Sequence, residues 1–162
     1  MIRVQAGDFD VGAEVEAVRA AAKGTGAIVT FTGVVRDFTG GPRLAAMTLE
    51  HYPDMTGRML ERIEAEANER WPLAASLIVH RYGRLAPGDN IVLVVTSSAH
   101  RKAAFEAAEF LVDWLKTKAP FWKKETTAAG EQWVGAEGAD DAAAARWGGQ
   151  PKPLPVRRRG RA

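Results

Sequence analysis

The sequence predicts a single α+β domain in which helices pack on an antiparallel or mixed sheet. Segments with the apolar spacing of helices alternate with segments rich in β-branched residues, and neither a repeat nor a linker divides them. The chain has 162 residues, of which 46% are hydrophobic and 26% charged, so it is long enough to bury one substantial core.

Four helices are expected. The second begins at Pro53, and proline is favoured in the first turn of a helix. Ser98 is expected to cap the third helix, because a serine hydroxyl can accept from the free amide groups at a helix start. The predicted helices are Gly12–Ala22, Pro53–Trp71, His100–Ala119 and Ala139–Trp147. The second is expected to bury a face made of Met55, Met59, Leu60, Ile63 and Ala67.

Six segments have the composition of strands. The loop Asp37–Arg43 follows the first of them, Ala27–Arg36, and its length predicts that Leu44–Tyr52 pairs with that strand. The turn Ala86–Asp89, which contains Pro and Gly, is expected to join the next two strands, Ala75–Leu85 and Asn90–Ser98. The last two strands, Phe121–Thr127 and Glu131–Val134, are expected to form a hairpin.

The uneven charge predicts a domain over residues 1–147 and a basic, Pro/Arg-rich, disordered tail over residues 148–162. The tail holds five Lys or Arg residues and no acidic residue, whereas the whole chain carries +2, which leaves −3 on residues 1–147. A solubilising appendage is the simpler interpretation of the tail, and weak attachment to RNA or an acidic partner is the alternative. For the negatively charged domain we expect no nucleic-acid partner.

Composition also limits the chemistry and the compartment. The chain has no cysteine, which excludes disulfides, thiolate metal sites and cysteine nucleophiles, so any sulfur chemistry needs an external donor. No apolar run approaches the roughly 18 residues that cross a bilayer, and the first residues lack the apolar core of a signal peptide. We therefore expect a cytoplasmic protein that has no membrane partner.

Three residues are candidates for holding an anion. His100 and Arg101 fall at a helix start directly after a buried strand, where unpaired amide groups and the helix dipole favour a phosphate or carboxylate. The alternative is that Arg101 points to solvent and His100 only caps the helix. Arg36 ends a strand, where a guanidinium can hold an anion or pair with a surface carboxylate.

The stretch LKTKAPFWKKE concentrates four lysines. Lys116 and Lys118 close a helix, where cations interact favourably with the dipole, so a structural role suffices for them. Lys123 and Lys124 follow an apolar stretch and alternate on a strand, so one of them should face the interior. A lysine has to lose its proton to attack a carbonyl, and desolvation beside an aromatic pair or repulsion from a neighbouring ammonium favours that loss.

Other common site types are not supported. The histidines, among them His51 and His80, are not spaced as a ligand pair, so we expect no metal and no bound cofactor. Glu50 and Glu125 are candidates for an acid, a base or a lysine partner. A Walker-type glycine loop and a serine nucleophile elbow are both missing from the sequence.

The motifs taken together resemble the large, catalytic subunit family of molybdopterin synthases. The likeness runs from about Val29 to Trp147 and leaves the tail from Gly148 outside. The segments that carry it are, in order, FTGVVRD, LEHYPDMT, ERWPLA, VHRYGRLAPGD, SSAHRKAAFEA and DWLKTKAPFWKKE.

The resemblance implies a sulfurtransferase that converts cyclic pyranopterin monophosphate to molybdopterin. Sulfur would arrive as a thiocarboxylate on the C-terminal Gly-Gly of a small ubiquitin-like carrier subunit. The implied fold is of the α/β hammerhead type. The implied assembly is a central self-dimer with one carrier at each far end, a heterotetramer.

The resemblance also implies roles for single residues. Lys116 matches the catalytic amine near the carrier's terminal carbonyl, and Lys123 matches a second essential amine that orients or activates the substrate. Arg36, His100 and Arg101 match anion-binding positions, in agreement with the reading of the sequence alone.

The chain departs from the family at one point. A basic residue commonly follows the WV motif in the family, whereas this chain has Glu137 there.

Two other classes stay open. A non-catalytic anion- or partner-binding module would lose its binding steeply with salt and tolerate replacement of a single lysine. A Schiff-base lysine enzyme would be trapped by borohydride together with a small ketone or aldehyde, and it would need no protein partner.

Overall fold

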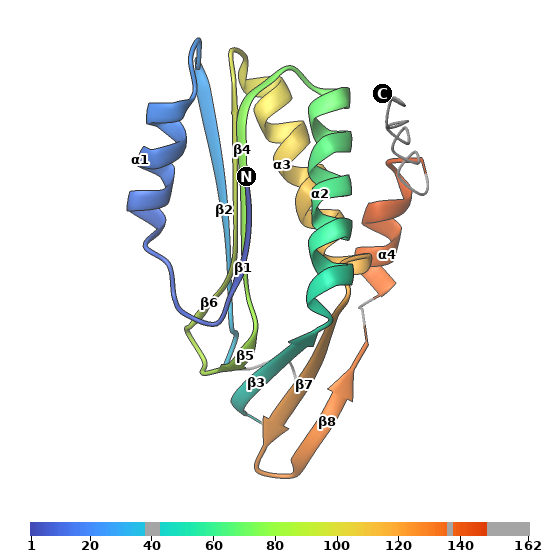
Figure 1. The fold of residues 1–162 in the computed structure, drawn as a ribbon. Coiled ribbons are helices and arrows are strands. Elements are labelled where there is room, and N and C mark those ends of the chain that lie inside the picture. Colours follow the sequence, from blue (N-terminus) through green and yellow to red (C-terminus); the bar gives the residue numbers. More distant parts are fainter. Residues whose placement is uncertain (38–42, 136–137, 149–162) are drawn as a thin grey trace, which may run out of the picture.

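The computed structural model describes residues 1–37, 43–135 and 138–148, which form four helices and two four-stranded sheets (Figure 1). The predicted α+β class is confirmed. Glu137 and residues 149–162, nearly all of the predicted tail, lie outside the described residues, as does most of the loop predicted over Asp37–Arg43.

The eight strands are divided between two sheets, A and B. The helices are α1 (Val11–Ala21), α2 (Pro53–Arg70), α3 (Arg101–Thr117) and α4 (Gly138–Ala145). Sheet A has the order β1 (Ile2–Gln5), β4 (Leu73–Arg81), β6 (Asn90–Ser98) and β2 (Ala27–Val34). Sheet B has the order β5 (Gly83–Leu85), β3 (Leu44–His51), β7 (Phe121–Thr127) and β8 (Gly130–Val134).

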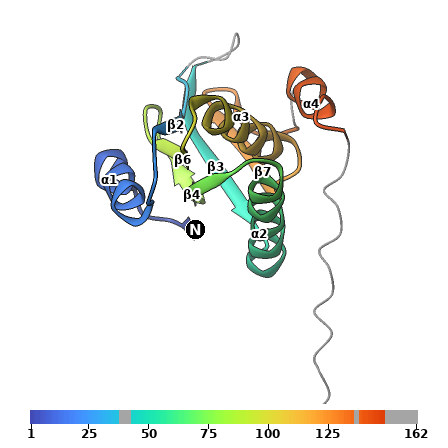
Figure 2. The same cartoon turned by 90° about the horizontal axis from the view of Figure 1, so that it is seen from above.

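Sheet A is covered on both faces, which explains why its central strands are apolar almost throughout. Leu77 and Val79 of β4 pack with Val18 of α1, whereas Ile78 between them packs with α2 and α3. Figures 1 and 2 show α1 on one side of this sheet and α2 and α3 on the other. Sheet B extends beyond the end of sheet A (Figure 1), and Leu44, Met47 and Leu49 of its strand β3 are buried on its inner face.

The predicted pairing of the second strand with the first was wrong. β2 pairs antiparallel with β6 along its length, whereas β3 pairs with β5 and β7 in the other sheet. The connection 35–43 is too long to force a hairpin, and β6 offers β2 an apolar partner whose two faces are both covered. The pairing therefore follows burial and not proximity in sequence.

The strand predicted over Ala75–Leu85 is divided at Tyr82. Gly83 has a φ of 89°, a conformation that favours glycine, and there the chain leaves sheet A and enters sheet B as β5. The short β1, which pairs parallel to β4, was not predicted.

Two details of the predicted helices were also wrong. The residue at the N-cap of α3 is His100, while the Ser98 hydroxyl donates to the carbonyl of Pro72 at 2.8 Å. Met55 is exposed, because the buried face of α2 contains Thr56, one position further on.

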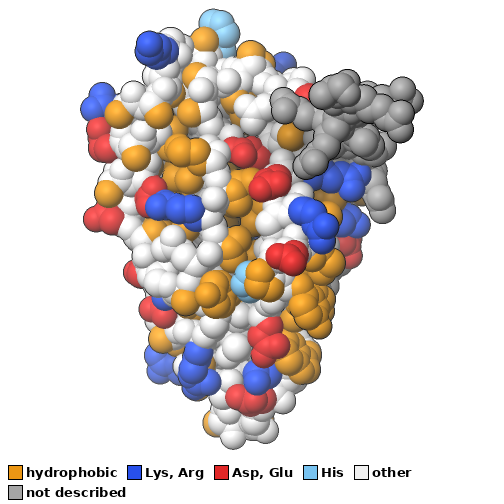
Figure 3. All heavy atoms as spheres, in the orientation of Figure 1, with side chains coloured by type: hydrophobic (Ala, Val, Ile, Leu, Met, Phe, Trp, Pro, Cys, Tyr) orange, Lys and Arg blue, Asp and Glu red, His pale blue; other side chains and the backbone are white. Residues whose placement is uncertain are grey.

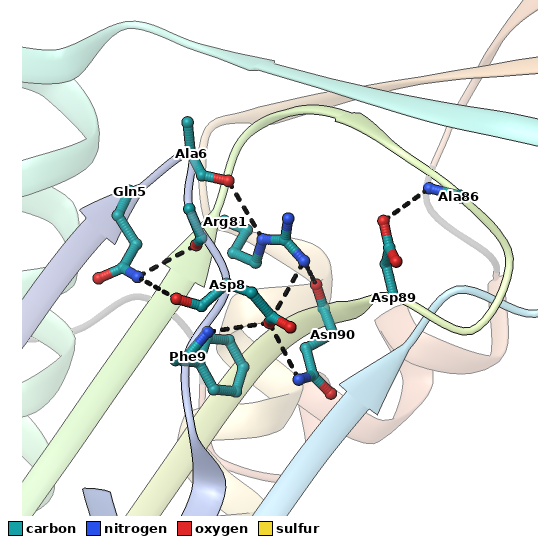
Figure 4. Close-up of polar contacts among 9 residues, drawn as sticks. Gln5, Ala6, Asp8, Phe9, Arg81, Ala86, Asp89 and Asn90 are labelled. Carbon is teal, nitrogen blue, oxygen red and sulfur yellow. Dashed lines mark hydrogen bonds and ion pairs between the residues drawn. The ribbon is translucent and has the colours of Figure 1, made fainter.

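A buried arginine holds the loop between β1 and α1 against sheet A (Figure 4). The Arg81 guanidinium donates to the carbonyls of Ala6 at 3.2 Å and Asn90 at 3.0 Å, and it lies 3.4 Å from the Asp8 carboxylate. Hydrogen bonds from the Asn90 side chain and from the Phe9 amide lower the pKa of Asp8. These contacts immobilise the end of β4 where the chain passes between sheets.

The last turn after α4 is held on α3 by two carboxylates, of which Asp113 is the less exposed. Asp113 accepts from Arg146 at 2.8 Å and from the indole N–H of Trp147 at 2.7 Å. Arg146 also pairs with Glu109 at 2.6 Å, but that carboxylate is 55% exposed whereas Asp113 is 12% exposed.

We expect Asp113→Ala to lower the free energy of unfolding by about 2 kcal/mol, because it leaves two donors without their buried acceptor. Urea denaturation would measure the change. The matched control is Glu109→Ala, which removes the exposed partner of the same arginine and should cost less than about 1 kcal/mol. Equal losses for the two variants would contradict this account of the contact.

Candidate active site

The N-terminus of α3 borders an open hollow of about 420 Å³, lined by Gly26, Ala99, His100, Arg101 and Lys102. Gly26 permits this arrangement, since a Cβ there would lie 2.3 Å from the Ala99 carbonyl oxygen. The His100 side chain makes no capping hydrogen bond among the described residues, and an imidazole and two cations line the hollow at a helix start, where amide groups lack helical partners. The site suits an anion.

A second hollow of about 570 Å³ adjoins the first, since Gly26 lines both. Arg19 adds another cation to its lining, and the hydroxyl of Thr25, also in the lining, lies 2.7 Å from that of Ser97. Sequence reasoning did not select Gly26 or Lys102. The only nearby feature of the sequence was the pair Gly24 and Gly26, which ends the first predicted helix.

Lys116 lies at the opposite end of α3. It is exposed in the last turn of that helix, as expected for a cation near the carbonyl end of the dipole. Arg101 and Lys116 are separated by fifteen helical steps, which is about 22 Å. One chain therefore does not bring the predicted anion pair and this lysine together.

Lys123 lies on the inner face of sheet B. Its Cα partner on β3 is the buried Leu49, and its amine forms an ion pair with Glu125 at 3.4 Å. Glu125 is buried and shares the face of Lys123, as residues two apart on a strand do. Lys116 and Lys123 stand on either side of the short connection 118–120.

Lys124 points to the other face of β7. It pairs with Glu131 at 3.0 Å and lies over the ring of Trp133 at 5.6 Å. The prediction that the two lysines face opposite sides is confirmed. Their exposures are nonetheless similar, 28% and 25%, because Glu131 and Trp133 cover the outer lysine.

Arg36 follows β2 and is exposed. The backbone of its neighbour Val35 is held by hydrogen bonds to Gly88 and Asp89. The eight residues of β2 span about 26 Å, so Arg36 lies at the end of that strand remote from Gly26 and the His100 hollow. The predicted residues thus fall into two groups. His100 and Arg101 lie at the end of α3 remote from sheet B (Figure 1), and Arg36, Lys116 and Lys123 lie nearer sheet B.

A cluster of rings beside Lys123 was not predicted. His80 stacks on Phe121 with 3.7 Å between ring centroids, and His51 lies 5.7 Å from Phe121 and 4.7 Å from Tyr82. Burial lowers the pKa of His80 to about 4; a hydrogen bond to the Arg81 carbonyl opposes this shift, and the nearby His51 adds to it.

A family model described as the MoaE protein matches residues 4–118. The chain belongs to the MoaE protein family. A molybdopterin synthase catalytic subunit from Cereibacter sphaeroides is 54% identical over 146 residues, which cover 90% of this chain and 99% of the relative. The sequence-based prediction of a molybdopterin synthase catalytic subunit is confirmed.

Solved structures agree with this MoaE assignment. A molybdopterin biosynthesis MoaE protein from Burkholderia ambifaria aligns with a TM-score of 0.79 at 55% identity, over 93% of this chain and 99% of that one. A protein–protein complex of subunits 1 and 2 of molybdopterin-converting factor from Helicobacter pylori contains a chain of the same fold. Its TM-score is 0.69 at 22% identity, over 82% of this chain and 89% of that one.

Across the described ranges, no three His, Asp or Glu side chains gather closely enough to hold a metal ion. None of the described helices combines the length and the apolar character that crossing a bilayer requires.

The buried His80 predicts a loss of stability in mild acid. The unfolded chain takes up a proton at this residue near pH 6.5, whereas the folded chain resists protonation until about pH 4, so falling pH favours unfolding across that interval. Between pH 7 and pH 5 the resulting loss in the free energy of unfolding is about 2 kcal/mol.

Urea denaturation at the two pH values would measure that loss. His80→Phe keeps an aromatic ring but cannot titrate, and it should lose about 2 kcal/mol less than the wild type between pH 7 and pH 5. Identical losses in both proteins would show that other groups cause the acid sensitivity.

Proposed function

We propose that this chain converts cyclic pyranopterin monophosphate to molybdopterin with sulfur from the C-terminal thiocarboxylate of a small ubiquitin-like carrier subunit. The observation that carries this proposal is the placement of Lys116 and Lys123 on either side of the connection between α3 and β7, in a chain of the MoaE family. Two amines that flank one short connection suit an anionic sulfur donor. Because the chain has no cysteine, the sulfur has to be delivered.

The two lysines are assigned different tasks. Lys116, exposed at the helix end, is accessible to an incoming carrier tail and is the amine beside its terminal carbonyl. The Glu125 carboxylate orients the Lys123 amine on the inner face, beside the buried Leu49, which suits an amine that orients or activates the substrate. Arg36, His100 and Arg101 bind the anionic substrate.

A second copy of the chain is proposed to complete the site. Within one chain, Arg101 and Lys116 are about 22 Å apart, farther than one small substrate reaches. If the α3 helices of two copies run in opposite directions, His100 and Arg101 of one copy lie beside the lysines of the other. The self-dimer implied by the family resemblance supplies such a partner.

The surface near the lysines offers apolar area for partners. Tyr52, Trp122 and Trp133 are exposed, and the first two rings meet edge to face at 5.1 Å. Figure 3 shows hydrophobic side chains gathered at the lower right of the molecule, where the β7–β8 hairpin lies in Figure 1. Exposed aromatic surface of this kind is typical of a protein contact, here the carrier or the second copy.

We expect Lys116→Ala and Lys123→Ala each to slow product formation by about a hundredfold or more, which corresponds to about 2.7 kcal/mol of barrier. The measurement is single-turnover conversion of cyclic pyranopterin monophosphate with a thiocarboxylated carrier. Arg3→Ala, which removes an exposed cation paired with Glu14 of α1, is the control and should stay near wild type. A folded wild type that binds the carrier but makes no product would overturn the proposed function.

The two-copy site predicts recovery of activity in mixed dimers. Lys123→Ala and Arg101→Ala should each be inactive or nearly so when purified alone. Co-expressed in equal amounts, half of the dimers are mixed, and each mixed dimer has one site with both substitutions and one with neither. Roughly a quarter of the wild-type turnover should therefore return. No recovery above the separate variants would overturn the two-copy site.

A further inference from the structure

The geometry points to His80 as a positioning residue for Lys123: by stacking on Phe121, it sets the entry of β7 and thereby the direction of the Lys123 amine. The catalytic consequence rests on the proposed function. The positional claim concerns this chain alone and has its own measurement.

His80 occupies an unusual place for a polar ring. It lies on β4, a central strand of sheet A, with Cα partners Val4 and Val92, and only 6% of it is exposed. It shares a face with Ile78, which packs against α2 and α3. Burying an imidazole there is costly unless its polar atoms are bonded, so an aliphatic residue would be the cheaper choice for packing alone.

The contact with Phe121 joins the two sheets. The rings are nearly parallel, with an interplanar angle of 13° and centroids 3.7 Å apart, so they overlap face to face. His80 belongs to sheet A and Phe121 is the first residue of β7 in sheet B. Any tilt of the imidazole would displace the start of that strand.

The imidazole itself cannot turn freely. Its Nδ1 lies 2.9 Å from the Arg81 carbonyl oxygen, and because a carbonyl only accepts, Nδ1–H is the donor. The Arg81 guanidinium is in turn held by the carbonyls of Ala6 and Asn90 (Figure 4). The ring is therefore oriented by a fixed segment at the end of β4.

Phe121 is held from β3 as well. His51, its Cα partner, has its ring 5.7 Å away, and the Nδ1 of that ring lies 3.3 Å from the hydroxyl of the buried Thr56. His51 lies in the LEHYPDMT motif, and the proposed reaction assigns it no role. In this arrangement it helps to fix the position of Phe121.

The position of Phe121 matters for Lys123 because the start of β7 has little other support. β7 pairs with β3 from Phe121 onward, but the pairing with β8 begins only at Lys123, opposite Val134. Phe121, Lys123 and Glu125 alternate onto one face of the strand. The stacked ring thus sets the position and twist of β7 at the point where the Lys123 side chain leaves the strand.

The direct test observes Lys123 in the whole chain. Lysines are reductively methylated with ¹³C, and the Lys123 signal is identified by its loss in Lys123→Arg. In His80→Leu we expect this signal to shift or broaden, the kcat of molybdopterin formation to fall about tenfold and KM to change less than about twofold. His80→Phe restores the stacked ring and should return both readouts toward wild type.

The matched control is Val79→Ala, a buried substitution on the same strand whose side chain faces α1. It should lower stability without moving the Lys123 signal. Phe121→Leu removes the contact from the other side and gives the same test if His80→Leu does not fold. The double variant should add little to either single change, since both remove one interaction.

An unchanged Lys123 signal in folded His80→Leu or Phe121→Leu overturns the inference, whatever the activity. A shifted signal that His80→Phe does not restore overturns the role of the stacked ring. A shifted and restored signal in a chain that makes no product supports the positioning role and shows that the proposed function fails separately.

Discussion

The packing of α3 against sheet A is the constraint on which the rest of the molecule depends. Phe110, Leu111 and Trp114 are buried in the core that this helix shares with α2 and the central strands, so the helix cannot slide without opening that core. One rigid element therefore carries the predicted anion pair, His100 and Arg101, at its start and Lys116 at its end. Their separation is a property of the fold, and a substrate that needs both ends has to meet two chains.

Local periodicity was sufficient for the helices and insufficient for the pairing of strands. The predicted bounds of the first three helices lie within two residues of those observed, because apolar spacing reports which face is buried. Pairing depends on which apolar edge is available after the chain collapses. β3 finds β7, about seventy residues later, and no short-range pattern contains that information.

The site shows the same division between local and distant information. That Lys123 and Lys124 face opposite sides follows from strand alternation alone. The stack of His80 on Phe121 joins two sheets through residues far apart in the sequence, and the requirement for glycine at position 26 arises from the Ala99 backbone. Residue type identified the candidates for the chemistry, whereas their supporting contacts depend on the fold.

The concentration of lysines at the end of α3 is therefore not one electrostatic cluster. Lys116 lies at the helix terminus, Lys123 pairs with Glu125 inside sheet B, and Lys124 pairs with Glu131 outside it. Because each strand lysine has a carboxylate on its own face, two adjacent ammonium groups can coexist without facing each other. The fold thereby presents a single inward amine beside an exposed one at the helix end. That pair, and not the local charge density, is what the proposed reaction with an anionic sulfur donor would use.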